Sequence, residues 1–474
     1  MRHCQQFFLL WGFTFVFVSS LYGAEAIKST RNEQVSVEVT VYNNNLALIK
    51  DTRKVMLSEG EGELRFMDVA AFIRPVTVHV QSLNAPADLK ILEQNYEYDL
   101  INTSKLMDKY VGKKVKLMLW NEFQDRKEVV EALLVSHNDN DPVFQIENEI
   151  YLGHPGIRIL PELPENLIAQ PTLMWQYNNA SEEAHQLEVS YLTDELTWNA
   201  DYIFVVNEED TGGDISGWVT IDNQSGATYR EAKLKLVAGE VQRVEEAYPE
   251  RYKLGVMAEM ARAPAFEEQA FFEYHIYNLD RRTTIKDRQI KQIRLLEAAG
   301  ITAQKELWVH GETYYFTTHY RPQKPKEPVH VYMKFKNAQD NRLGIPLPAG
   351  VMRLYKKDKE GSLQFIGEDR IKHTPKDEEV KLKVGEAFDV VAERTQTDYK
   401  QLSTQLYESA WEITVRNHKE QEVQVGVIEP LSGNWQVISE SHPHKKLDAF
   451  TIRYDVTVPP DAEVKVQYRI RVGL

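Results

Sequence analysis

Alternation between apolar and polar positions runs along most of this chain and predicts β-strands. The clearest case is the segment Val35–Val41, in which every second residue is valine. A period of two places one set of side chains on the buried face of a sheet. The same patterning marks Glu63–Phe66, Val76–Val80, Lys114–Leu119, Leu187–Leu192, Tyr202–Val206 and Trp218–Asp222. The chain is therefore expected to be mainly β, with two to three layered antiparallel β-sandwich-like domains and little helix.

Two segments depart from this pattern. Lys105–Tyr110 follows the capping residues Asn102, Thr103 and Ser104 and precedes Gly112, which predicts a short capped helix. Residues 285–299 fit two descriptions, because their apolar residues suit either one helical face or an irregular strand. Periodicity alone does not choose between the two over so short a run.

Proline and composition divide the chain into regions. Pro161, Pro164 and Pro171 lack backbone donors and argue against a central strand between them. Residues 246–270 lose the strand patterning and are rich in Ala, Glu and Met. The expected organisation is a signal peptide at 1–26, an N-terminal β domain at 27–165, the first part of a second β domain at 166–245, a linker or insertion at 246–270, and a C-terminal β-sandwich region at 271–474.

The first 26 residues have the form of a secretory signal peptide. Arg2 precedes an apolar run from Phe7 to Val18, and small residues end at Ala24-Glu25-Ala26. The run is shorter than the ~20 residues that span a bilayer, and no second run of that length follows. We therefore expect an exported protein, periplasmic or extracellular, with no transmembrane segment in the mature chain.

Charge and cysteine usage exclude some classes of function. The 474-residue chain has a formal net charge of -15, which disfavours nucleic acid and acidic lipid surfaces. Its one cysteine, Cys4, lies in the leader, so the mature chain has no disulfide and no thiolate for a metal. Stability must then come from buried apolar area, which a chain of this length can supply.

No familiar catalytic or cofactor-binding motif occurs, so no catalytic residue and no cofactor are predicted. His442 and His444 flank a proline, but we interpret them as solvated loop residues. Two acidic loops contain oxygen ligands of the kind that calcium prefers, although plain turns are the favoured interpretation of both. These loops are Asp139-Asn140-Asp141 and the candidate calcium loop Glu208, Glu209, Asp210 and Asp214.

Carboxylates beside an aromatic residue are a pattern found in sugar hydrolases. Asp194, Glu195 and Asp201 flank Trp198 in this way. The same residues equally suit a turn between two strands with the indole in the core, and that interpretation is favoured.

A weak recurrence links three segments. Each has an aromatic residue, an alternating strand and then an asparagine that opens a polar turn. The segments are Trp218–Asn223, Tyr332–Asn337 and Trp411–Asn417. Three related ligand sites would fit this pattern, but strand ends in β-sandwich layers fit it better. Trp198, Trp218 and Trp411 are accordingly expected in the core.

Several ordered blocks resemble a known family. They are Tyr191–Tyr202, Gly217–Gly226, Leu236–Val241, Leu347–Gly350, Phe365–Asp369, His373–Pro375 and Gly385–Val390, with Val41–Lys50 and Tyr98–Leu100 as a matching front half. Together they resemble a bacterial secreted family with a domain of unknown function (DUF4139), some of whose members are labelled mucoidy-inhibitor-A-like. The resemblance implies a mostly β, exported protein, favours a strand over 285–299, and transfers no catalytic residue.

The expected function is that of an exported, non-enzymatic binding or scaffold protein of the envelope or the medium. An envelope protein or a glycan is the expected partner. The alternative is a secreted hydrolase acting on envelope polysaccharide or peptide. A tight polar cluster in one deep cleft would favour the hydrolase, whereas a flat apolar or aromatic patch would favour binding.

The leader generates a first testable prediction. Cleavage near Ala26 should release a soluble chain whose first residue is Ile27 or an immediate neighbour. N-terminal sequencing of the exported protein measures this directly. Recovery of intact Met1 in a washed membrane fraction would contradict it.

Overall fold

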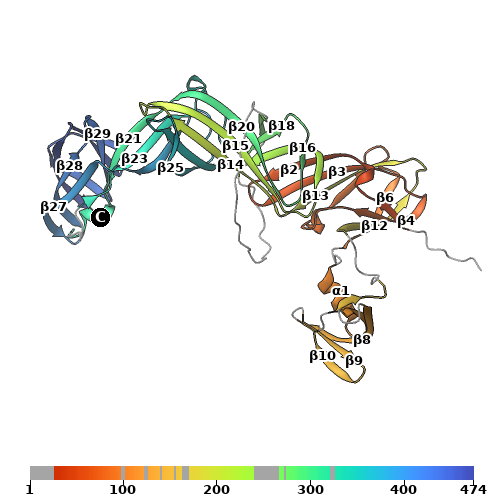
Figure 1. Cartoon of the computed structure of the whole chain (residues 1–474). Coiled ribbons are helices and arrows are strands. Elements are labelled where there is room, and N and C mark those ends of the chain that lie inside the picture. Colours follow the sequence, from red (N-terminus) through yellow and green to blue (C-terminus); the bar gives the residue numbers. More distant parts are fainter. Residues whose placement is uncertain are drawn as a thin grey trace, which may run out of the picture. The chain divides into compact units, whose positions relative to one another are not determined.

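The computed structural model of the chain describes residues 26–97, 102–121, 126–138, 141–153, 156–162, 170–239, 266–271, 274–320 and 326–474 (Figure 1). Its elements are mostly strands in several largely antiparallel sheets, as the alternating pattern predicts. One α-helix and four short 3-10 turns occur in the described residues, the turns being Arg31–Glu33, Pro75–Thr77, Thr313–Phe316 and Gln339–Asn341. None of the helices described is both long enough and apolar enough to cross a bilayer.

The chain forms two compact units. The first consists of residues 1–35, 51–71 and 79–189, and the second consists of residues 36–50, 72–78 and 190–474. Residues 170–189, which sequence patterning assigned to the second region, therefore belong to the first unit. The signal peptide and most of the predicted linker at 246–270 lie outside the described residues.

A four-stranded sheet in the first unit has the order β1-β4-β12-β6, with β1 at Ile27–Ser29, β4 at Gly60–Met67, β12 at Thr172–Asn179 and β6 at Leu89–Glu97. The buried guanidinium of Arg53, on β3 (Leu46–Val55), lies 3.5 Å from the ring centre of Phe66. It donates to the Asp51 carboxylate at 2.8 Å and to the carbonyls of Ser29 and Met67. A buried charge persists where its donors are satisfied in this way.

A five-stranded sheet, also in the first unit, carries the predicted helix. Its order is β10-β9-β8-β7-β11, with β7 at Lys114–Asn121, β8 at Arg126–Asn138, β9 at Asp141–Ile146, β10 at Glu149–Leu152 and β11 at Ile157–Ile159. Helix α1 spans Thr103–Tyr110 and is capped by the Asn102 side chain, which accepts the Lys105 amide, so the helix prediction is confirmed. Met107 and Tyr110 of α1 share a core with Phe144.

The expected strand at Val76–Val80 is wrong in its first half. Pro75–Thr77 forms a 3-10 turn, and β5 begins only at His79 and runs to Ser82. Proline lacks an amide proton and has a fixed φ, both of which suit the first position of a helical turn. The Thr77 hydroxyl closes the turn by donating to the Arg74 carbonyl at 2.7 Å.

In the second unit the valine strand is confirmed as β2 (Gln34–Tyr42), with Val37, Val39 and Val41 buried. It pairs in parallel with β16 (Tyr229–Ala238). The strands β17, β18 and β19 lie on the other side of β16, at Phe266–Phe271, Tyr274–Leu279 and Thr283–Ile285. Strand β13 spans His185–Thr193 and contains the predicted strand Leu187–Leu192.

A second sheet of this unit has the order β20-β15-β14-β24-β25. Its strands are β14 at Leu196–Val206, β15 at Gly212–Asn223, β20 at Gln289–Thr302, β24 at Gly350–Lys357 and β25 at Leu363–Ile371. The two alternatives for residues 285–299 are now decided, because β20 pairs antiparallel with β15 along its length. Backbone bonding to a neighbouring strand, which no local pattern encodes, fixes this segment as a strand.

The C-terminal residues form a sandwich of two sheets. The six-stranded sheet β26-β23-β21-β29-β32-β31 has strands at Glu379–Glu386, His330–Lys336, Gln304–His310, Val423–Pro430, Thr451–Val458 and His444–Asp448. The five-stranded sheet β22-β27-β28-β33-β30 has strands at Lys326–Glu327, Val390–Ser403, Leu406–Asn417, Ala462–Gly473 and Asn434–Glu440. Trp411, Tyr454 and Tyr468 lie in the shared core.

The three recurring asparagines lie at strand ends and act as buried clamps. Asn223, Asn337 and Asn417 are each fully buried. Each amide nitrogen donates to three backbone carbonyls, and each amide oxygen accepts an amide proton from the turn that follows. The structural interpretation of the recurrence is therefore confirmed. Asn179, at the end of β12, makes the same set of bonds and is a fourth clamp that the sequence comparison missed.

The clamps generate a stability prediction. Asn417→Leu leaves the carbonyls of Gln421, Val458 and Pro459 without their donor in a buried site. An unsatisfied buried polar group costs about 1–3 kcal/mol, so we expect the free energy of unfolding to fall by roughly 2–4 kcal/mol. Chemical denaturation measures the change.

Asn434→Leu is the matched control, because Asn434 is an exposed residue at the start of β30. It should change the free energy of unfolding by no more than about 0.5 kcal/mol. Equal stability of the Asn417 variant and the native protein would rule out the clamp as a stabilising feature.

Candidate functional site

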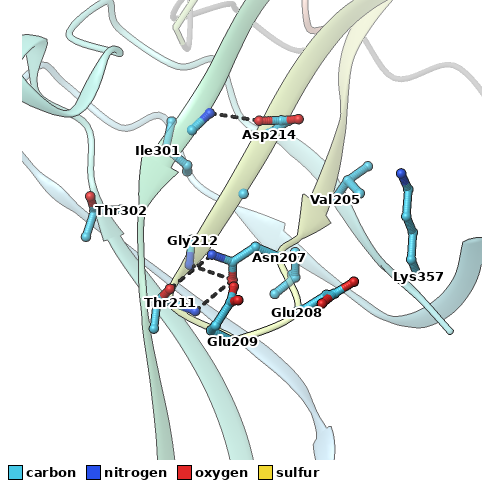
Figure 2. A pocket seen from close by; sticks show the side chains of 13 residues that line it. Val205, Asn207, Glu208, Glu209, Thr211, Gly212, Asp214, Ile301, Thr302 and Lys357 are labelled. Atoms are coloured by element: carbon cyan, nitrogen blue, oxygen red, sulfur yellow. Dashed lines mark hydrogen bonds between the residues drawn. The ribbon is translucent and has the colours of Figure 1, made fainter. Parts of the chain in front are cut away.

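The candidate calcium loop lies at an open depression of about 540 Å³ beside the ends of β14, β15 and β20 (Figure 2). Glu208, Glu209, Asp214 and Lys357 are among the residues that line it. The side-chain oxygen of Asn207 accepts the amides of Thr211 and Gly212 at 2.9 and 3.2 Å and so closes the turn. An asparagine that replaces a backbone acceptor is a frequent turn device and requires no ion.

Asp210 is not directed into the depression. Its carboxylate lies between the ammonium groups of Lys305 and Lys356, at 2.6 and 2.5 Å. Burial raises the pKa of Asp210, but the bonds to Lys305 and Lys356 outweigh burial and hold that pKa below its usual value. Asp214 accepts the Gly300 amide at 2.7 Å. Two ammonium groups on one carboxylate leave it no net negative charge for a cation.

Glu208, Glu209 and Asp214 therefore line one depression, whereas Asp210 forms ion pairs with Lys305 and Lys356. Across the described ranges, no three His, Cys, Asp or Glu side chains come together in a way that could hold a metal. Calcium binding by this loop stays a prediction, and the ion pairs of Asp210 with Lys305 and Lys356 argue against it. Of the other acidic loop, Asp139 and Asn140 lie outside the described residues.

The three carboxylates around Trp198 are each engaged by another side chain. Asp194 accepts two bonds of 3.0 Å from Arg74, and Asp201 accepts Arg353 at 3.0 Å. Glu195 accepts the side-chain amide of Asn45 at 3.3 Å. Each carboxylate thus has a different partner.

The core prediction holds for two of the three tryptophans. Trp198 and Trp411 are buried, and the Trp198 indole donates to the Val237 carbonyl at 3.2 Å. The prediction is wrong for Trp218, which is only half-buried, with the Arg294 guanidinium 5.5 Å from the ring centre. The alternation of β15 turns Val219 inward and so turns Trp218 outward.

The two loop histidines make separate contacts. His442 lies 2.9 Å from the hydroxyl of Ser441, and His444 lies 2.8 Å from the Glu440 carboxylate. Glu440 is the last residue of β30 and His444 the first residue of β31, so the interpretation of His444 as a solvated loop residue is wrong: it is a half-buried strand residue. The contact gives His444 a carboxylate and brings no second imidazole to it.

An aromatic cluster that sequence analysis did not single out lies on the outer side of the six-stranded sheet, opposite the sandwich core. We call it the Trp308 patch and define it as Trp308, His310, His330, Tyr332 and Lys381. The ring centre of Trp308 lies 4.6 Å from that of Tyr332 and 5.5 Å from that of His310, and His310 lies 5.9 Å from His330. The Lys381 ammonium lies 4.6 Å from the Trp308 ring centre.

Strand pairing builds this patch. Trp308 and His310 belong to β21, whereas His330 and Tyr332 belong to β23, and Trp308 lies opposite His330 in the register. Both strands carry an aromatic, a valine and an aromatic, with the valine directed toward the core. That shared pattern is the sequence signal that could have identified the patch, although it gives no indication that the two strands are neighbours.

The patch keeps its imidazoles neutral. Burial, together with the nearby His330, Lys381 and Lys383, lowers the pKa of His310 to about 4. Burial is also the main reason that the pKa of His330 is lowered. Nε2 of His310 lies 3.3 Å from the Tyr332 hydroxyl. A neutral imidazole has one donor and one acceptor, so the patch combines ring faces with groups that bind hydroxyls.

A second exposed surface lies on the five-stranded sheet of the first unit, on the face away from α1. Ile157, Met118 and Val129 lie side by side in the register, with Ile157 and Val129 exposed to 63% and 53%. Ile150 and Leu152 of β10 are exposed as well. A row of exposed apolar side chains on one face is typical of surfaces that bind other molecules.

Comparison with known proteins gives one match. Residues 187–474 match the family described as "Domain of unknown function (DUF4139)". A search of curated proteins finds no match. The matched range contains the candidate calcium loop and the whole of the Trp308 patch, and most of the first unit lies before it.

The candidate calcium loop generates a further prediction. Because Lys305 and Lys356 already neutralise Asp210, we expect chelator-treated protein to release no binding heat when calcium is titrated to about 1 mM, within the affinity range of extracellular modules. Isothermal titration calorimetry measures this. A saturable heat that disappears in Glu209→Gln and persists in Glu360→Gln, which removes the same charge from a residue outside the lining of the depression, would instead place an ion in the loop.

Proposed function

The chain belongs to the family that carries this domain, DUF4139, and from that premise we propose that it is an exported, non-enzymatic binding or scaffold protein of the cell envelope or the extracellular medium. The sequence blocks that resemble mucoidy-inhibitor-A-like members support placing it among them. The leader-like residues 1–26 support export to the periplasm or beyond. An envelope glycan or protein is the proposed partner.

The Trp308 patch is the observation that carries the proposal. Trp308 itself is buried, but the patch offers the partly exposed ring of Tyr332, the partly exposed neutral imidazole of His310 and the exposed ammonium of Lys381 on one sheet face. Sugars bind such groups well, since their C–H faces stack on rings and their hydroxyls bond to uncharged donors and acceptors. We therefore propose a glycan as the ligand of the patch.

The alternative, a secreted hydrolase, has less support. Glycoside hydrolysis needs two available carboxyl groups about 5–9.5 Å apart across the scissile bond. Asp194 and Asp201, the sequence candidates for this chemistry, are held by Arg74 and Arg353. Both carboxylates already accept hydrogen bonds from a guanidinium group, which leaves fewer of their oxygen lone pairs for a substrate.

Affinity electrophoresis tests the proposed function. The mature protein should be retarded in native gels that contain a polysaccharide, with polygalacturonate, dextran and xylan as the probes. Tyr332→Ala should weaken retardation about tenfold, the change in dissociation constant that ~1.4 kcal/mol produces. Tyr355→Ala is the matched control, because Tyr355 is a half-buried strand tyrosine outside the patch.

Thermal melts of both variants separate binding from folding. The glycan proposal requires that the Tyr332 variant loses retardation while its melting temperature stays close to that of the Tyr355 variant. Migration of the native protein unchanged by all three polysaccharides would overturn it.

A further inference from the structure

Some charged groups around the Trp308 patch have a partner of opposite charge, and others do not. Glu306 accepts the Trp308 indole at 2.6 Å and the Arg453 guanidinium at 2.9 Å, and lies 3.4 Å from the Lys334 ammonium. Asp455 accepts Arg453 at 2.6 Å as well. These carboxylates are therefore already paired with cations of the same sheet face.

The other acidic groups of this face are also engaged. Asp455 has a second cation in Lys445 at 2.7 Å. Glu379 lies 3.0 Å from Lys334, and Glu386 lies 3.8 Å from His330. Glu379 is thus paired with a cation, whereas the imidazole beside Glu386 is neutral. Asp369 of β25 accepts the Lys383 backbone amide at 2.7 Å.

Two lysines of β26 lack such a partner. Lys381 and Lys383 occupy successive outward positions, and in the register they lie opposite Lys334 and Tyr332. Neither ammonium has an ion pair or hydrogen bond with any residue in the described ranges. The Lys381 ammonium instead lies 4.6 Å from the Trp308 ring centre and 5.4 Å from that of Tyr332.

These two unpaired ammonium groups contrast with the rest of the chain, whose formal net charge is -15. A local positive site on an acidic protein selects for an anion at that place, because the rest of the surface repels it. The lysines lie directly beside the rings and imidazoles of the patch. A ligand that meets both must carry an acidic group on or next to a ring with hydroxyls.

We propose that the Trp308 patch binds anionic polysaccharide, with the sugar ring against Tyr332 and His310 and its carboxylate or phosphate group between Lys381 and Lys383. The inference rests on the proposed function and specifies its ligand class. Lysine binds carboxylate and phosphate alike as a point charge, so the two acidic groups share one chemistry. Exposed ion contacts of this kind weaken as salt screens them.

A pair of probes isolates the charge. Polygalacturonate and its methyl ester have the same rings and linkages and differ in whether the acid is ionised. Titration calorimetry of the full mature chain should give at least about tenfold tighter binding to the acid than to the ester. Raising sodium chloride from about 0.05 M to about 0.5 M should remove most of that difference, because the Debye length becomes about threefold shorter. Dextran and phosphorylated dextran repeat the comparison for a phosphate.

Variants assign the effect to the two lysines. Lys381→Ala with Lys383→Ala should lower affinity for polygalacturonate about tenfold or more, and by a clearly larger factor than it lowers affinity for the ester. Lys383→Ala alone should also lower the affinity for polygalacturonate, and it leaves the Lys381–Trp308 contact in place. Lys359→Ala, in an exposed turn away from the patch, removes the same charge and should have no effect.

The outcomes distinguish the two proposals. Equal binding of acid and ester that depends on Tyr332 would overturn the anionic inference and support the glycan proposal. Binding of polyglutamate as tight as that of polygalacturonate would show that charge alone is recognised and overturn the sugar component. Binding of neither the acid, the ester nor either dextran would overturn both.

Discussion

One buried ion pair joins the two sheets of the C-terminal sandwich, and the strand that carries Trp308 and His310 ends beside it. Arg394 of β27 and Glu429 of β29 belong to different sheets, are fully buried and lie 2.5 Å apart. Glu327 accepts the same guanidinium at 2.8 Å, and the Trp411 ring centre lies 5.9 Å from it. Burial alone would lower the pKa of Arg394, but Glu429, Tyr468 and Glu327 raise it, so the guanidinium stays charged. Loss of one partner from such a pair costs ~3–5 kcal/mol.

The strand that contains Glu429 lies beside the strand that carries part of the Trp308 patch. β29, which contains Glu429, is the parallel neighbour of β21, and Val309 lies opposite Val427 in the register. Gly311, directly after β21, has no side chain, and a Cβ there would lie 2.0 Å from a carboxylate oxygen of Glu429. The end of β21 is thus fixed against the ion pair. Its outward residues, Trp308 and His310, belong to the strand that ends beside this pair.

Carboxylates at two places that the sequence offered as candidates, and beside the patch that it missed, are engaged by other strands. Asp210 at the loop, Asp201 near Trp198 and Glu306 beside the patch each accept a bond from a cation on another strand. Free charge occurs instead on Lys381 and Lys383, in a chain whose composition is acidic. Abundance of a residue type therefore says little about where its charge is available, since pairing across strands decides which groups are left for a ligand.

The sequence by itself determined the mainly β class, the capped helix at α1 and the three clamps that begin at Asn223, Asn337 and Asn417, because alternation, capping and turn chemistry act between near neighbours in the chain. It also indicated the family. Strand pairing decided what it left open or missed: the strand β20, the outward side of Trp218 and the meeting of Trp308 with His330. Trp308 and His330 are 22 positions apart, and β21 has β29, more than a hundred residues later, as its other neighbour. Only the tertiary structure brings such residues together, because backbone hydrogen bonds between strands depend on which partner a strand finds and not on its own pattern.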